Sequence, residues 1–269
     1  MIKLFKNESA QPGQPKEVKE ILEEQIETSL KEFNRSNIGL FMSAFTAGLE
    51  IGFSVLFMGT MLTLFGQDLS PNVMKLVLAL CYPIGFIFVI IGRSELFTEH
   101  TALAILPVLR GAVRLRAIFL LWGLVYSGNL LGGFLFSILI AKIGPAVGFI
   151  EPSAFHDLAY HLVSYDWDVI LLSALLAGWM MGLLGWLVTS SQETISRILV
   201  ITMVTAIIGV AGLHHCIVGS IEVFTGMITS PDIHFTDYLH FQLWATLGNT
   251  LGGTFFVAIL KFSHVRLKG

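Results

Sequence analysis

Six long apolar stretches, separated by short polar segments, limit this chain to folds that lie inside a lipid bilayer. A helix needs about 20 consecutive apolar residues to cross the hydrocarbon core of a membrane. Only 13% of the residues are charged, whereas soluble domains carry about 25%. The sequence therefore predicts an all-α integral membrane protein with six transmembrane helices, at residues 38–66, 72–108, 113–143, 167–190, 196–229 and 241–262.

The segment before the first apolar stretch is polar and charged, so we expect no cleavable signal peptide. Its apolar residues recur at the three- and four-residue spacing of one helical face, and they are Val18, Ile21, Leu22, Ile26, Leu30 and Phe33. Anionic lipids repel its Glu-rich opposite face, so the helix is expected to dock on the protein's own cytoplasmic surface or to stay solvated. We divide the chain into an N-terminal cytoplasmic amphipathic segment (1–36), a transmembrane domain (37–262) and a cytoplasmic tail (263–269).

Lysine and arginine are distributed unequally between the two sides of the predicted helices. Six lie in the N-terminal segment, three follow the second apolar stretch, one follows the fourth, and the C-terminal end has Lys261, Arg266 and Lys268. Lys75 and Lys142 fall on the other side. Positive residues favour the cytoplasmic side. We therefore expect a multi-pass protein of the cell (inner) membrane with both termini in the cytoplasm and with the loops 144–166 and 230–240 outside.

The two halves of the chain resemble each other. Residues 94–98 are similar to 221–225, and the Gly-Asn pair at 128–129 recurs at 248–249. Each half has three helices, an odd number, so the second half must insert upside down relative to the first. Inverted repeats with interrupted helices are typical of transporters and channels. The sequence thus predicts an inverted 3+3 repeat in which the second and fifth helices, both longer than one span requires, are broken.

The Gly-Asn pairs are expected to hold helices together. Gly128 and Gly248 begin small-x-x-x-small patterns, which allow two helices to approach closely in lipid. Asn129 and Asn249 should form hydrogen bonds across these contacts rather than bind a substrate.

Several ionisable side chains fall inside the apolar stretches. Each costs about 2.5–3.5 kcal/mol at mid-membrane, so they must pair or face water, and such residues usually mark a functional site. Arg93 is expected to form a clamp with Glu95 or Glu99 on the broken second helix. The full set is Glu50, Arg93, Glu95, Glu99, His100, His214, His215 and Glu222.

His215 follows a segment in which Gly209 and Gly212 can open the helix. Histidine is the side chain that most readily changes charge near neutral pH, and the ends of broken helices offer free backbone N–H groups. These features predict a site that holds a small anion and exchanges a proton with it; a purely structural histidine is the alternative. His214 and His215 would point about 100° apart on a helix, so we expect no metal site. We expect no cofactor, and the net charge of −3 indicates no nucleic-acid partner.

At these residues the chain resembles the formate/nitrite transporter family, over roughly residues 37–262. Residues 96–98 look like the loop that interrupts the family's second helix. Residues 212–215 look like the broken fifth helix, with His215 as the central histidine. The Gly-Asn pairs match those of the family's third and sixth helices.

This resemblance implies an aquaporin-like fold and a homopentamer with one pore per subunit. It also implies anion transport: small monovalent anions cross as weak acids, together with protons, beside the central histidine. Thr98 is expected to form a hydrogen bond with that histidine. The implied pore residues are His215, Thr98, Leu96, Phe97, Tyr82, Ile208 and His214.

The sequence departs from the family pattern around the predicted pore. His214 stands where typical members have an acidic residue, and no lysine occurs between Lys142 and Lys261. Glu50 and Glu222 stand at positions that are apolar in typical members. A different weak acid therefore remains open as the substrate, as does a cation or neutral molecule such as ammonium or water. We find no motif of a membrane enzyme, so we expect no enzymatic activity.

Overall fold

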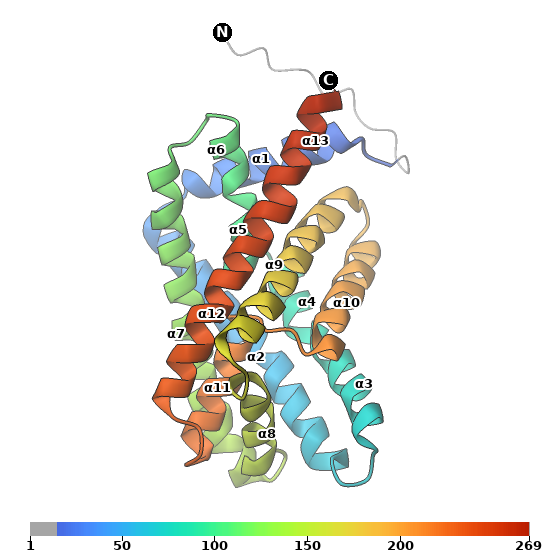
Figure 1. Cartoon of the computed structure of the whole chain (residues 1–269), viewed down its shortest axis with the longest axis vertical. Helices are drawn as coiled ribbons and strands as arrows, with labels where there is room; N and C mark the ends of the chain where they lie inside the picture. Colours follow the sequence, from blue (N-terminus) through green and yellow to red (C-terminus); the bar gives the residue numbers. More distant parts are fainter. Residues whose placement is uncertain (1–14, 269) are drawn as a thin grey trace.

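The computed structural model describes residues 15–268, so most of the predicted N-terminal segment and nearly all of the tail are covered (Figure 1). All regular elements in this range are helices. Six are long and apolar enough to cross a membrane, which confirms the predicted number. They are α2 (Asn37–Phe65), α3 with α4 (Pro71–Cys81 and Pro83–Gly92), α7 (Leu115–Val147), α9 (Trp167–Ser190), α10 (Thr194–Ala211) and the stretch Phe235–Val265.

Two boundaries differ from those expected from sequence. The predicted outer loop 144–166 contains the helix α8 (Pro152–Val163), which begins with a proline at its first position. The final stretch starts earlier than expected and consists of α12 (Phe235–Leu251), the π-helical η1 (Gly252–Ile259) and α13 (Leu260–Lys268). The described residues of the predicted tail therefore continue the last helix.

The second and fifth apolar stretches each contain a long helical part, a non-helical segment and a short helical part. In the second, α4 is followed by 93–96 and then by α5 (Phe97–Leu103) and α6 (Ile105–Leu109). In the fifth, α10 is followed by 212–217 and then by α11 (Val218–Thr229). We call 93–96 the first interruption and 212–217 the second. Both begin with a left-handed residue, Arg93 (φ 60°) and Gly212 (φ 63°).

Asn129 on α7 satisfies the backbone of the first interruption. Its Oδ1 accepts a hydrogen bond from the Phe97 N–H (2.8 Å), and its Nδ2 donates to the carbonyls of Glu95 and Ala44 (both 2.8 Å). Buried backbone groups without a partner cost free energy. The amide side chain of Asn129 offsets this cost where the helix is interrupted in the interior.

Asn249 on α12 does the same for the second interruption. Its Oδ1 accepts from the Cys216 N–H (2.8 Å), and its Nδ2 donates to the carbonyls of Ala174 (2.7 Å) and His214 (3.0 Å). These bonds match Phe97 with Cys216. This correspondence differs from the sequence similarity, which pairs 94–98 with 221–225, because a short run of common residues does not identify hydrogen-bond partners.

The glycines beside these asparagines lie where helices touch. A Cβ atom at Gly128 would stand 2.8 Å from the Cβ of Ala44, and one at Gly248 would stand 2.6 Å from the Cβ of Ala174. Such distances are too short for a methyl group, so α2 and α7, like α9 and α12, approach to a separation that only glycine permits.

The helix α1 (Val18–Phe33) lies across one end of the molecule, where α13 also ends, and α8 lies at the opposite end (Figure 1). The buried face of α1 includes Ile21, Leu22 and Ile26. Lys16 Nζ donates a hydrogen bond to the carbonyl of Thr189 (2.7 Å). The segment is therefore docked on the protein. We refer to these two ends as the α1 end and the α8 end.

Candidate functional site

A cavity of about 440 Å³ lies toward the α8 end, and we call it the α8-side cavity. Its walls come mainly from α3, α8, α10 and the beginning of α11. The second interruption forms part of its lining, so the cavity reaches the centre of the fold. Its polar side chains are Lys75, Tyr82, His161, His215 and Glu222.

His215 lines this cavity, is 1% exposed, and has hydrogen bonds at both ring nitrogens. The N–H groups of Ile217 and Val218 both donate to Nδ1 (3.3 Å each). Because Nδ1 is an acceptor, the neutral ring carries its proton on Nε2. That N–H donates to Thr98 Oγ1 (3.0 Å). The first turn of α11 and the side chain on α5 thus fix both the orientation and the tautomer of the ring.

Glu222 lies one turn into α11 and is 7% exposed. Its side chain lines the α8-side cavity together with Gly219, three residues earlier on the same helical face. As an ionisable side chain in an apolar stretch, Glu222 was expected to pair with another charged group or to face water. Within residues 15–268, however, no side chain or backbone group forms a hydrogen bond or ion pair with its carboxyl. The cavity is what this carboxyl faces.

Lys75 and His161 stand on the α8-side cavity wall from α3 and α8. Desolvation of the His161 ring, followed by the nearby charge of Lys75, lowers the pKa of His161 below its ordinary value. His161 is therefore neutral at pH 7, and Lys75 supplies positive charge. No lysine occurs between Lys142 and Lys261, and the lysine on the cavity wall comes instead from the start of the second apolar stretch. The sequence shows that Lys75 lies near the start of a helix, but it does not show that this helix lies beside the cavity.

The first interruption is tied to the α1 end by charged side chains. Arg35, just after α1, donates hydrogen bonds to Glu95 (2.9 Å) and Glu32 (3.0 Å), and His100 also forms a hydrogen bond with Glu95. Burial, and then the charge of Glu95, raise the pKa of Glu32.

The predicted Arg93 clamp is wrong. Arg93 ends α4 in a left-handed conformation with an exposed side chain, and it forms no ion pair with Glu95, Glu99 or any other residue in the described range. Arg35 takes its place on Glu95. Sequence distance concealed this partner, because Arg35 and Glu95 are 60 residues apart.

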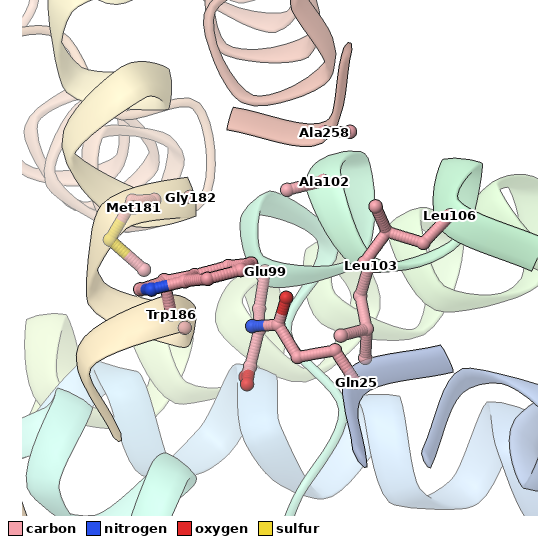
Figure 2. A pocket seen from close by; sticks show the side chains of 10 residues that line it. Gln25, Glu99, Ala102, Leu103, Leu106, Met181, Gly182, Trp186 and Ala258 are labelled. Carbon is pink, nitrogen blue, oxygen red and sulfur yellow. The ribbon is translucent and has the colours of Figure 1, made fainter. Parts of the chain in front are cut away.

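A second, much smaller pocket lies between α1, α5, α9 and η1 (Figure 2). The side chains of Gln25 and Glu99 stand beside the Trp186 ring there. Its volume of about 10 Å³ is roughly that needed for one water molecule. Toward the α1 end the structure thus shows a pocket far smaller than the α8-side cavity.

The remaining predicted pore residues lie at different depths. Tyr82 and Ile208 line the α8-side cavity. Leu96, Phe97 and Thr98 are almost fully buried and line neither pocket, so they lie in packed protein next to His215.

His214 does not line the α8-side cavity. Its Nδ1 bonds with Ser173 Oγ (2.8 Å), and its Nε2 with the carbonyl of Leu162 (3.1 Å). Both ring nitrogens thus hold the second interruption against α8 and α9, and the place of His214 in the pore stays a prediction.

Glu50 lies on α2 near Gly92, away from both pockets. Its Oε2 is buried without a hydrogen-bond partner in the described range. Within residues 15–268, no group of His, Cys, Asp and Glu side chains is arranged to hold a metal ion. Cys81 and Cys216 are free and buried.

Comparison with known proteins gives one family. The model of the family described as "Formate/nitrite transporter" matches residues 19–263. Among curated proteins, the chain is similar to the inner membrane protein YfdC of Escherichia coli strain K12. The two are 29% identical over 240 residues, which cover 88% of this chain and 75% of that protein.

Among solved structures, the chain is similar to one titled "FNT family ion channel". The TM-score is 0.83 at 22% identity, with 91% of this chain and 99% of that chain covered. A structure titled "Pentameric formate channel with formate bound" matches with a TM-score of 0.74 at 22% identity, covering 86% and 98% of the two chains. At this identity the likeness establishes the fold.

Proposed function

Because the chain belongs to the formate/nitrite transporter family, as its motifs indicated, we propose that it is a homopentameric membrane channel for small monovalent anions or their weak acids. The observation that carries this proposal is the α8-side cavity, which ends at the buried, hydrogen-bonded His215. The solved structure whose title names a pentameric formate channel supports both the assembly and the substrate class.

We further propose an aquaporin-like inverted repeat in which the second and fifth helices are broken. The equivalent bonds of Asn129 and Asn249, and the left-handed residues that begin both interruptions, support it. The predicted domain division belongs to the same proposal. The lysine and arginine distribution supports a cytoplasmic α1 end and an outward α8 end. The name of the relative YfdC supports the inner membrane as the location.

The anion passes the central histidine together with a proton. A bare anion pays a large desolvation cost in an apolar slit, whereas a neutral acid pays only that of a small polar group. In this proposal, Tyr82 and Ile208 form the α8-side wall of the passage, and Leu96 and Phe97 close it beyond His215. Thr98 holds the ring so that its edge faces the permeating acid.

A channel for a cation or neutral molecule such as ammonium is the second candidate. The observation that favours it is Glu222, whose buried carboxyl faces the α8-side cavity. A negative charge at that place attracts cations and opposes anions.

Flux measurements in proteoliposomes separate these two functions. Formate, nitrite, acetate and ammonium are each supplied at about pH 5.5 and about pH 7.5, on either side of the ordinary histidine pKa. We expect weak-acid flux above that of protein-free liposomes, larger at the lower pH, and a strong reduction in His215→Gln. Ammonium flux without weak-acid flux would establish the second candidate and reject the first.

A further inference from the structure

The hydrogen bonds of His215 limit what this ring can do with a proton. A doubly protonated imidazole has donors at both nitrogens. In this structure Nδ1 already faces two donors, the N–H groups of Ile217 and Val218. A second proton would place N–H against N–H, so the ring would have to leave both bonds and rotate. As it stands, His215 is a neutral ring that donates to Thr98.

Glu222 is placed differently. Its carboxyl lines the same α8-side cavity, is almost fully buried, and has no hydrogen-bond or ion-pair partner in the described part of the chain. Both carboxyl oxygens are therefore available to a molecule in the cavity. A protonated carboxyl can donate a hydrogen bond, and an ionised one can only accept.

The other charged and titratable groups around the cavity favour an anion at the cavity mouth. They come from α3, the residue before α4, α8 and the second interruption, and are Lys75, Tyr82, His161 and His215. Of the other elements that pack on α11, α2 contributes only Met58 and Gly66 to the lining, and α7 and α12 contribute no residue. Lys75 is thus the cation that meets an incoming anion before it reaches Glu222.

From this arrangement we propose that Glu222 is the residue that exchanges a proton with the permeating weak acid, and that His215 stays neutral. This inference rests on the proposed weak-acid function. The Glu222 O–H bond breaks, and a new O–H bond forms on the substrate, so that a carboxylic acid and an anion become a carboxylate and a neutral acid. A proton from the outer solution then reaches Glu222 through water in the cavity and restores its O–H bond.

The pH dependence of formate influx distinguishes the two proton donors. In Glu222→Gln only formic acid already protonated in solution can enter, so its influx should fall about tenfold for each pH unit, as the protonated fraction does. The wild-type protein should show a shallower fall and exceed Glu222→Gln by at least about tenfold at about pH 7.5. Near pH 5 the two should agree within about twofold, which shows that the variant has a working pore.

Two matched variants complete the experiment. Glu222→Asp retains a carboxyl and should keep the shallow profile. Glu151→Gln removes a negative charge from an exposed residue at the same end of the molecule and should leave the profile unchanged. His215→Gln should lower influx while keeping the shallow slope, because Glu222 is intact.

Parallel profiles for the wild type and Glu222→Gln overturn the role of Glu222. A steep profile in His215→Gln also overturns it, because that result assigns the proton to the histidine. If the wild-type protein shows no formate influx above that of protein-free liposomes, and none of nitrite or acetate, the proposed function itself fails. That outcome is distinct from parallel profiles, which require influx to be present.

Discussion

The two interruptions share a backbone arrangement but differ in what surrounds them. Each begins with a left-handed residue and is held by one asparagine with three hydrogen bonds. Around the first, α1 covers the chain and Arg35 and His100 engage Glu95. Around the second, His215 and Glu222 line a cavity of about 440 Å³. One frame therefore supports an end covered by α1, which we call the closed end, and an end with a large cavity.

The residues that hold the two interruptions in place thus differ from the residues that set the charge around them. The asparagines and glycines lie on the long helices and recur in both halves. The charged groups at the first interruption depend on α1, and those near the second on α3 and α8. The elements that differ between the halves thus decide which end is covered by α1 with its ion pairs and which has a carboxyl facing a cavity.

The largest expected effect tests the shared frame. Asn129→Ala and Asn249→Ala each leave one N–H and one carbonyl at an interruption without a partner in the interior, and a buried unsatisfied group costs about 1–3 kcal/mol. We expect each variant to lose roughly 3 kcal/mol or more of stability, measured by thermal unfolding in detergent. The exposed Asn34→Ala, which removes one hydrogen bond to the Leu30 carbonyl, is the control and should lose far less. If only one of the buried variants is destabilised, the two interruptions do not share a frame.

An intermediate effect is expected at the closed end. Arg35→Gln removes the cation from Glu95, whose side chain is 14% exposed, and hydrogen bonds to charged groups contribute about 1.5–3 kcal/mol. We expect faster hydrogen exchange along α1 (Val18–Phe33). Arg110→Gln also removes a cation that binds α1, through Glu23, but there both side chains are at least 40% exposed, and exposed pairs contribute about 0–1 kcal/mol. Equal exchange in the two variants would show that Arg35 does not hold the closed end.

Features that depend on a single helix could be predicted from the sequence, whereas contacts between residues far apart in the sequence could not. Apolar length gave the six spans, because a bilayer imposes it on each helix separately. The sequence singled out His215 and Glu222 as ionisable groups in apolar stretches. It missed Arg35 as the partner of Glu95 and Lys75 as a cavity residue, because each lies on a helix that meets the site only in the folded chain. It could not tell the surroundings of His214 from those of His215, because adjacent histidines look alike until their hydrogen bonds are known.

The smallest expected effect is a pH dependence of α1 docking. Burial, and then the charge of Glu95, raise the pKa of Glu32, so docked α1 binds this proton more tightly than undocked α1. Docking should therefore weaken as pH rises through the raised pKa, while below the ordinary value of about 4.5 both forms are protonated and the penalty vanishes.

Glu32→Gln removes the penalty. Its α1 should dock more tightly than wild type at pH 7, by less than about 1 kcal/mol, and equally well near pH 4. Hydrogen exchange of α1, corrected for the intrinsic rate at each pH, measures this difference, and Glu27→Gln on the exposed face of α1 is the control. Weaker docking of Glu32→Gln at pH 7 would mean that the bond from Arg35 to Glu32 outweighs the repulsion by Glu95, and that the closed end gains stability from both acids.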